Sequence, residues 1–213
     1  MIGTVYTKIY SEPPLNIKEA LRYAGAKNDA PEVTALLTEV FEEVKEKLCY
    51  KVCFAEFEIK HDGEFLDLGF CKTESKNLKQ NLINCQSVVL FAATVGLELD
   101  RYVVRYEKTS PSKRLLLQAL GAERVESLCD CFNSEITAEK CSQGKFTRPR
   151  FSPGYGDLPL ELQREIFAVL NCPQRIGVSL NESLFMTPSK SVTAIIGVGE
   201  KIQEFCYENN GIH

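Results

Sequence analysis

The stretch RPRFSPGYGDLP, residues 148–159, lies between two segments whose apolar residues recur at helical spacing. Each proline lacks a backbone N–H and fixes its own φ, so the stretch cannot be a regular helix or a central strand. The glycines at 154 and 156 let the backbone approach a ligand closely, and the prolines reduce the entropy lost when the loop is ordered. These features predict a rigid loop between two helices.

Two side chains of this loop suit a charged organic ligand. The guanidinium of Arg150 can hold a carboxylate through two parallel hydrogen bonds. The ring of Tyr155 offers an aromatic face that attracts a cation such as a sulfonium. An alternative needs no ligand: the loop is a tight corner between helices, and Arg150 forms an ordinary salt bridge. The loop chemistry alone leaves both interpretations open.

Composition narrows the class of protein. The chain has 213 residues, 44% hydrophobic and 25% charged, which is ordinary for a globular protein with a real core. A net charge of −4 without a basic stripe argues against a nucleic-acid surface. No stretch has the pattern of a signal peptide or the apolar length of a membrane span, so we expect a cytoplasmic protein without a membrane partner.

Hydrophobic periodicity predicts helices and strands that mix without regular βαβ alternation. Helices are expected at 14–25 (capped by Asn16), 30–48, 75–85 (capped by Ser75), 97–108, 114–140 and 158–172. Strands are expected at 50–60 and 64–70 (a hairpin around HDG), at 86–96 (buried on both faces), and twice within 175–199 around the turn MTPSKS. We therefore predict one α+β domain over 1–213, in which the helical segment 1–48 could be semi-detached.

Nine cysteines are many for a cytoplasmic chain. Their surroundings are mostly apolar and no C-x-x-C pair occurs, which favours small buried side chains over a zinc site or a disulfide framework. A reactive thiol remains the alternative. The two histidines, His61 and His213, are too few for a histidine-rich metal cage. The cysteines are Cys49, Cys53, Cys71, Cys85, Cys129, Cys131, Cys141, Cys172 and Cys206.

Motifs of familiar catalytic or nucleotide-binding centres do not explain the chain. GVGEKIQ, residues 197–203, lacks the third glycine of the dinucleotide fingerprint and comes too near the end of the sequence for the rest of that unit. A serine or cysteine nucleophile would have to recruit His61 as its base. The loop at 148–159 is therefore the main functional candidate.

This loop and the segment after it resemble the activation domain of cobalamin-dependent methionine synthases. In that family an arginine, one further residue and a small residue precede Pro-Gly-Tyr, as in RFSPGY here. An amphipathic helix follows, and then a block of the type G-x-x-L-T-E-S-x-x-M-x-P-x-x-S-V-S. The matching residues of that block are Gly177, Leu180, Asn181, Glu182, Ser183, Met186, Pro188, Ser191, Val192 and Thr193. The match covers residues 115–197.

The resemblance implies a fold and a binding site. The fold would be a mixed, largely antiparallel sheet with helices packed around it. The site would bind S-adenosylmethionine, extended and shallow, with Arg150, Ser152 and Tyr155 as ligand residues and Gly154 contributing backbone geometry. Alignment of the preceding helix adds Glu126. Arg150 would suit the carboxylate of the ligand and Glu126 its ammonium or sulfonium. A further acidic ligand of the family, from its N-terminal part, has no matching position.

The resemblance also implies a role. The chain would be a free-standing reactivation partner of a cobalamin-dependent methionine synthase, or a related corrinoid protein, that lacks its own activation domain. It lacks the D-x-H-x-x-G pattern that ligates cobalamin, so the partner would carry that cofactor. Reductive methylation of cob(II)alamin would take one electron from a flavodoxin-like donor and the methyl group from S-adenosylmethionine. No general acid or base is required of this chain, whose role would be positioning.

Two other hypotheses stay open. The chain could be a non-catalytic S-adenosylmethionine sensor or an assembly factor for another corrinoid methyltransferase. It could also be a thiol- or metal-dependent enzyme that uses its nine cysteines.

Overall fold

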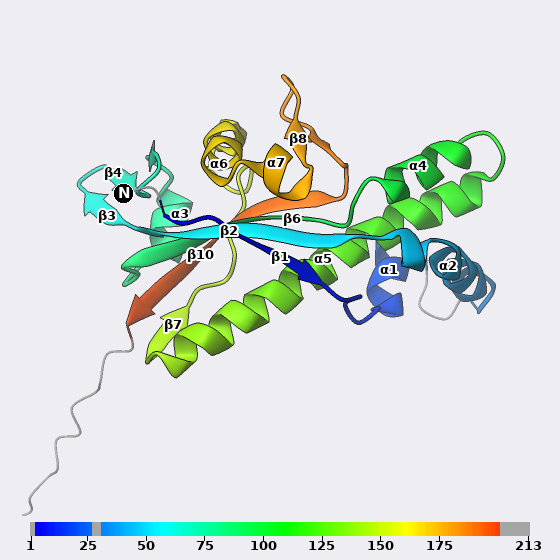
Figure 1. The fold of residues 1–213 in the computed structure, drawn as a ribbon, viewed down its shortest axis with the longest axis horizontal. Helices are drawn as coiled ribbons and strands as arrows, with labels where there is room; N and C mark the ends of the chain where they lie inside the picture. Colours follow the sequence, from blue (N-terminus) through cyan, green and yellow to red (C-terminus); the bar gives the residue numbers. More distant parts are fainter. Residues whose placement is uncertain (1–2, 27–30, 201–213) are drawn as a thin grey trace, which may run out of the picture.

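The computed structural model describes residues 3–26 and 31–200, and a five-stranded sheet lies at its centre (Figure 1). The strand order is β1–β2–β6–β10–β7, and neighbouring strands in it are antiparallel. The strands are β1 (Tyr6–Tyr10), β2 (Tyr50–Glu58), β6 (Ser87–Thr94), β10 (Ser191–Glu200) and β7 (Lys145–Thr147). The predicted α+β class with a largely antiparallel sheet is confirmed.

The middle strand β6 explains why the sheet is covered on both faces. In its sequence, SVVLFAAT, every residue between Ser87 and Thr94 is apolar. Because alternate residues of a strand point to opposite faces, both faces of β6 are apolar. Val88 and Leu90 belong to one hydrophobic cluster, whereas Val89 and Phe91 belong to another. The prediction of a strand buried on both faces is confirmed.

A single long helix covers one face. Helix α5 (Pro111–Ser142) has 32 residues and so extends about 48 Å at the usual rise per residue. Leu128, Phe132 and Ile136 form one row of its side chains against the sheet. Figure 1 shows α5 running across the sheet, while α6 (Gln163–Leu170) and α7 (Cys172–Ile176) lie on the opposite face.

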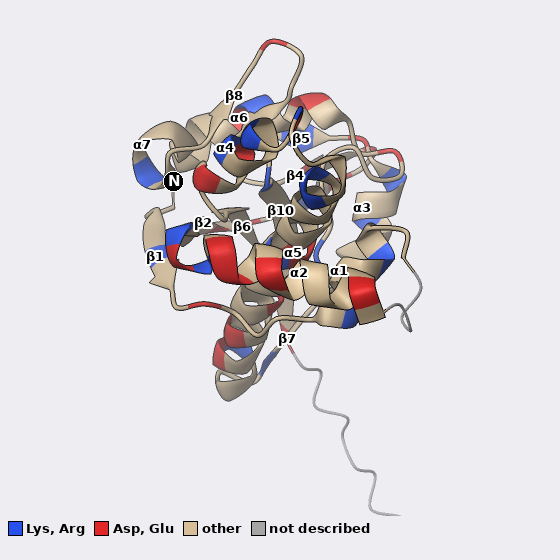
Figure 2. Ribbon diagram, turned by 90° about the vertical axis from the view of Figure 1, so that its right-hand side faces the viewer, with Lys and Arg blue, Asp and Glu red and all other residues tan. Residues whose placement is uncertain are grey.

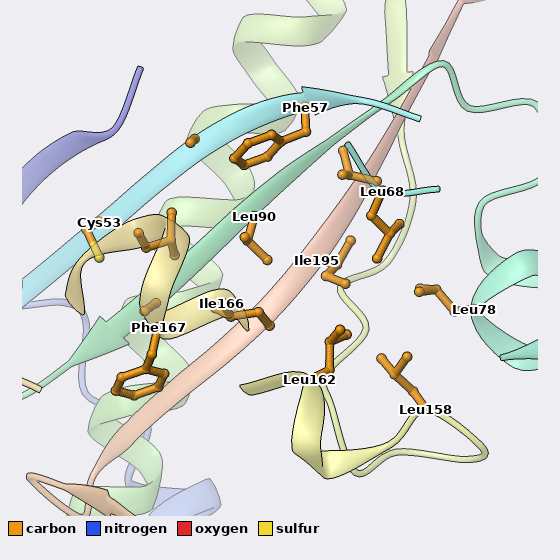
Figure 3. Close-up of a cluster of buried hydrophobic side chains, with 14 of the residues drawn as sticks. Cys53, Phe57, Leu68, Leu78, Leu90, Leu158, Leu162, Ile166, Phe167 and Ile195 are labelled. Atoms are coloured by element: carbon orange, nitrogen blue, oxygen red, sulfur yellow. The ribbon is translucent and has the colours of Figure 1, made fainter. Parts of the chain in front are cut away.

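The second face is sealed by α6, α7, the short 3₁₀ helix η2 (Leu160–Leu162) and α3 (Lys76–Asn81). Leu158, Leu162 and Ile166 point toward the sheet, and Leu78 of α3 approaches them from the side (Figure 3). Ser75 caps α3 as predicted, because its hydroxyl accepts a hydrogen bond from the Leu78 N–H.

Three further helices pack against the N-terminal end of α5. Helices α1 (Ile17–Tyr23), α2 (Pro31–Val44) and α4 (Glu98–Arg105) share a hydrophobic cluster with the first turns of α5, and the 3₁₀ helix η1 (Lys45–Lys47) extends α2. The predicted cap of α1 is confirmed, since the Asn16 side chain accepts from the Glu19 N–H. The single domain over 1–213, with residues 1–48 as a semi-detached part, stays a prediction.

The predicted hairpin around HDG is present, but its first strand is not the main 50–60 strand. Strand β2 ends at Glu58, and both of its edges are occupied by β1 and β6. The turn around Gly63 instead joins β3 (Lys60–Asp62) to β4 (Phe65–Asp67), which form a separate small sheet with β5 (Lys72–Thr73).

The two strands expected around MTPSKS do not pair with each other. Strand β10 pairs with β6 and β7 instead. The earlier segment is a short hairpin of β8 (Ser179–Leu180) and β9 (Met186–Thr187), closed by a turn in which the Asn181 side chain accepts from the Phe185 N–H. The glycines of GVGEKIQ do not form a nucleotide-binding loop, because Gly197 and Gly199 lie within strand β10. Residues 201–203 of this motif fall outside the described residues.

The described cysteines are divided between core and surface. Cys53, Cys85, Cys129 and Cys172 are buried, whereas Cys49, Cys71 and Cys131 are partly exposed and Cys141 is exposed. Cys206 and His213 lie outside the described residues. Within residues 3–26 and 31–200, no cluster of three or more His, Cys, Asp or Glu side chains could hold a metal ion. Every helix in those ranges is too short or too polar to cross a membrane.

Candidate functional site

The loop at 148–159 is attached to the sheet by its backbone. Strand β7 pairs with the end of β10, and the chain then stays beside β10 through a bridge between Phe151 and Ile195. Each residue donates its N–H to the carbonyl of the other, at 2.9 Å in both directions. Because these two hydrogen bonds hold Phe151, the residues on either side of it, Arg150 and Ser152, are held in place as well.

Backbone turns shape the tip of the loop. The Tyr155 N–H donates to the Ser152 carbonyl at 3.1 Å, and the Gly154 N–H donates to the Leu158 carbonyl at 2.9 Å. Gly154 has φ +84°, a backbone conformation that residues with a Cβ rarely adopt. This explains the glycine of the Pro-Gly-Tyr motif. The tip is therefore a defined structure, as the prolines and glycines predicted.

Tyr155 presents its ring to solvent. The side chain is 70% exposed, although its ring packs edge-to-face on Phe151 with 5.5 Å between centroids. Leu158 is buried and anchors the chain after the turn. An aromatic face held in this way is available to a ligand at low entropic cost.

Arg150 and Glu126, two of the expected ligand residues, are in contact through an ion pair. Arg150 Nη2 donates to Glu126 Oε2 at 2.5 Å, and Nη1 donates to Asp130 Oδ1 at 2.6 Å. Burial alone would lower the pKa of Arg150, but hydrogen bonding to Asp130 and the charges around it raise that pKa above its usual value. Sequence reasoning missed Asp130. Its spacing of four residues from Glu126, on one face of a helix, was the signal that could have identified it.

Arg150, Glu126 and Asp130 form what we call the Arg150 cluster. A shallow groove continues from this cluster along α5. Its volume is about 850 Å³, within the range of small-molecule sites, and Asp130 belongs to both the groove and the Arg150 cluster. One wall comes from the segment before and at the start of α1, and the other from α5. The lining residues are Pro14, Leu15, Asn16, Ile17, Lys18, Ser127, Asp130, Cys131 and Ser134. Figure 2 shows that acidic positions recur along α5.

A buried ion pair holds the first wall of the groove. Arg124 is fully buried and donates to the Glu123 carboxylate through Nε at 2.6 Å and Nη2 at 2.7 Å. Its Nη1 and Nη2 also donate to the carbonyls of Pro13 and Pro14, both at 2.7 Å. Burial favours a lower pKa for Arg124, but the Glu123 carboxylate outweighs it and raises that pKa.

The Glu123 carboxylate also connects the two walls of the groove. Its Oε1 accepts from the Asn16 N–H at 2.9 Å and from the Ser127 hydroxyl at 2.7 Å. Asn16 and Ser127 lie on opposite walls of the groove. A single buried carboxylate therefore sets the distance between them.

Comparison with known proteins identifies the family. The family model described as "Vitamin B12 dependent methionine synthase, activation domain" matches residues 75–209, well over half of the chain. The chain belongs to this family. The match contains the whole loop, Glu126 and Asp130, and it confirms the family that the sequence motifs indicated. No curated protein matches the sequence significantly.

A solved structure extends the likeness beyond the family match. The chain is similar to the structure described as "Crystal Structure of the MetH Reactivation Domain bound to AdoHcy", with a TM-score of 0.65 and 14% sequence identity. The superposition covers 91% of this chain and 78% of that one. Since residues before 75 are needed to reach that coverage, the similarity in fold extends into the N-terminal part, which the family model does not match.

Proposed function

We propose that this chain binds S-adenosylmethionine at the Arg150 cluster and serves a cobalamin-dependent methionine synthase as its reactivation module. One observation carries the proposal: Arg150 lies between two carboxylates, one of which, Asp130, also lines a groove, and the same loop exposes Tyr155. The similar MetH reactivation domain is described as bound to AdoHcy, a ligand with the same amino-acid and nucleoside parts.

The charges of the cluster complement the amino-acid end of the ligand. S-adenosylmethionine carries a carboxylate, an ammonium and a sulfonium, so its net charge is positive at neutral pH. Arg150, Glu126 and Asp130 together are net negative. Arg150 would bind the carboxylate, and the two acidic side chains would bind the ammonium. Tyr155 would face the sulfonium. The backbone at Ser152 and Gly154 would contact the ligand closely.

The role of the chain in methyl transfer would be to position the donor. The partner would carry cobalamin, which would supply the methyl acceptor after one-electron reduction by a flavodoxin-like donor. The ligand residues of this chain bind and orient S-adenosylmethionine so that its methyl group faces that acceptor. Such orientation contributes to rate without any proton transfer by the protein. A partner that lacks its own activation domain is the natural recipient, and the cytoplasm is the expected location.

Calorimetric titration with S-adenosylmethionine tests the binding site. Arg150→Ala should weaken binding at least tenfold, because one charge-assisted hydrogen bond is worth about 1.5–3 kcal/mol. Arg101→Ala is the control for loss of an arginine in an ion pair, since Arg101 pairs with Glu98 on α4. Absence of binding to the unmodified protein, with or without the partner, would refute the proposal. Equal affinities of the Arg150→Ala variant and the unmodified protein would do the same.

Turnover separates reactivation from the alternative of a non-catalytic sensor or assembly factor. The partner, in its cob(II)alamin form, is mixed with this chain, a reductant and S-adenosylmethionine labelled on its methyl group. Transfer of label to cobalamin that depends on this chain supports reactivation. Binding without transfer would leave the sensor or assembly role and overturn reactivation.

A further inference from the structure

We propose that helix α3 braces the ligand loop, and that Asp157 and Asn81 are the positioning residues through which it acts. The inference rests on the proposed function, because it concerns how Arg150 and Tyr155 are presented. Helix α3 contacts the loop across about 70–80 residues of sequence, so nothing in the loop motif itself reveals the connection.

The first contact is at the N-terminal end of α3. The Asp157 carboxylate accepts from the Ser75 hydroxyl, from the Lys76 N–H at 2.7 Å and from the Asn77 N–H at 3.2 Å. The Ser75 hydroxyl in turn accepts from the Leu78 N–H at 3.0 Å. The first N–H groups of a helix have no partners within it, and here Asp157 and Ser75 satisfy three of them together.

The second contact is at the other end of the same helix. Asn81, the last residue of α3, donates from Nδ2 to the Pro149 carbonyl at 3.2 Å. Pro149 immediately precedes Arg150. Helix α3 therefore holds the loop at both ends, directly before Arg150 and two residues after Tyr155.

Side-chain packing between the two ends leaves the loop little freedom to shift. Leu78 of α3 and Leu158 of the loop belong to one hydrophobic cluster, into which Leu78 points from the side of α3 (Figure 3). Gly156 has φ +58°, and a Cβ there would lie only 2.3 Å from Asn77 Nδ2. The tip of the loop thus rests directly on the helix.

Bracing of this kind matters for affinity. Tyr155 is exposed, and its ring contacts Phe151 within the same loop. Arg150 is held by Glu126 and Asp130 on α5. Without Asp157 the residues after Tyr155 would lose one of their two anchors, the other being the buried Leu158, and ordering them again would reduce the free energy of ligand binding.

The test compares Asp157→Asn with Asp157→Glu and with Asn81→Ala. An amide at 157 has one oxygen instead of two to accept the three donors, whereas glutamate keeps both oxygens. Asp100→Ala is the matched control, because the Asp100 carboxylate makes the same kind of contact with the Ser189 N–H and hydroxyl, away from the ligand loop. Affinity for S-adenosylmethionine is measured by calorimetry, and backbone mobility by hydrogen exchange of the amides of 150–156.

We expect Asp157→Asn to weaken S-adenosylmethionine binding about tenfold, which corresponds to about 1.4 kcal/mol. Asn81→Ala should have a smaller effect, and Asp157→Glu should restore part of the affinity. Exchange of the 150–156 amides should become faster in Asp157→Asn and stay unchanged in Asp100→Ala.

Two results would overturn the brace. One is unchanged exchange of the loop amides in Asp157→Asn, and the other is an equal loss of affinity in Asp157→Asn and Asp100→Ala. Hydrogen exchange needs no ligand, so it decides the claim even if the unmodified protein fails to bind S-adenosylmethionine. In that case the proposed function falls, and faster exchange in Asp157→Asn alone would still support the brace.

Discussion

Replacing Arg124 by methionine should strongly destabilise the protein, because it leaves the Glu123 carboxylate buried without its counter-charge. Both side chains are essentially inaccessible to water, and Arg124 makes four hydrogen bonds to protein acceptors. Breaking a buried pair by removing one partner costs about 3–5 kcal/mol. For a chain of this length each kcal/mol lowers the melting temperature by about 2–4 °C, so we expect a drop of about 6–20 °C.

The double variant Arg124→Met with Glu123→Gln separates the ion pair from simple loss of packing. A glutamine at 123 can still accept from the Asn16 N–H, and it leaves no unpaired charge in the core. We therefore expect the double variant to be more stable than Arg124→Met alone. The free energies of unfolding come from urea titrations, which are comparable as long as the slope m stays constant. The coupling energy then follows from the double-mutant cycle.

Lys8→Met is the control for a change of the same chemical type. Lys8 pairs with Glu135 at the surface, where both side chains are 42% exposed, so its loss should cost less than about 1 kcal/mol. A loss below about 1 kcal/mol in Arg124→Met would refute the reasoning, since that is the range of an exposed pair. So would a double variant whose loss equals the sum of the single losses.

Three further predictions concern single residues. Gly156→Ala should destabilise the protein more than Gly144→Ala in urea titrations, because both glycines have positive φ but only Gly156 has Asn77 within contact distance of an added Cβ. The Ser75 hydroxyl lowers the pKa of Asp157, so the contribution of this carboxylate to stability is present above the usual aspartate pKa of about 3.9 and lost as pH falls through its lowered value. Asp157→Asn should therefore make acid unfolding, followed by circular dichroism, less steep. Residue-resolved alkylation should modify Cys141 well before Cys129, because Cys141 is exposed while burial raises the pKa of Cys129 to about 12.

Elements with strong local signals could be predicted from the sequence. The long helix carries apolar residues at helical spacing between Leu116 and Phe132, and strand β6 has a continuous apolar run. The caps at Asn16 and Ser75 also follow from local chemistry. Strand partners could not be predicted in the same way, because pairing depends on which edges remain free after the chain folds. The hairpin at 60–67 and the β8–β9 ribbon illustrate this limit.

The candidate site was predictable only where a motif marks it. Arg150 was identified from the chemistry of the loop and Glu126 from the family pattern, and the structure places them in contact. Ser127, Asp130 and the wall at 14–18 escaped prediction, because the groove exists only once the start of α1 packs against α5. The Glu123–Arg124 pair that creates this packing resembles an ordinary surface pair in the sequence. Only its burial reveals its role.

The geometry of Arg150 bears on the two interpretations that its sequence context left open. Its salt bridges to Glu126 and Asp130 fit the corner interpretation, yet they do not exclude a ligand. Each carboxylate takes one N–H of the guanidinium, from Nη2 and Nη1 respectively, and neither forms the two-pronged contact that arginine makes with its strongest partners. A ligand carboxylate that binds through two prongs can therefore replace either single contact. In the proposed site, the displaced acidic side chain would lie beside the ligand's ammonium, so the salt bridges that hold the loop corner would also supply the charges that an amino acid requires.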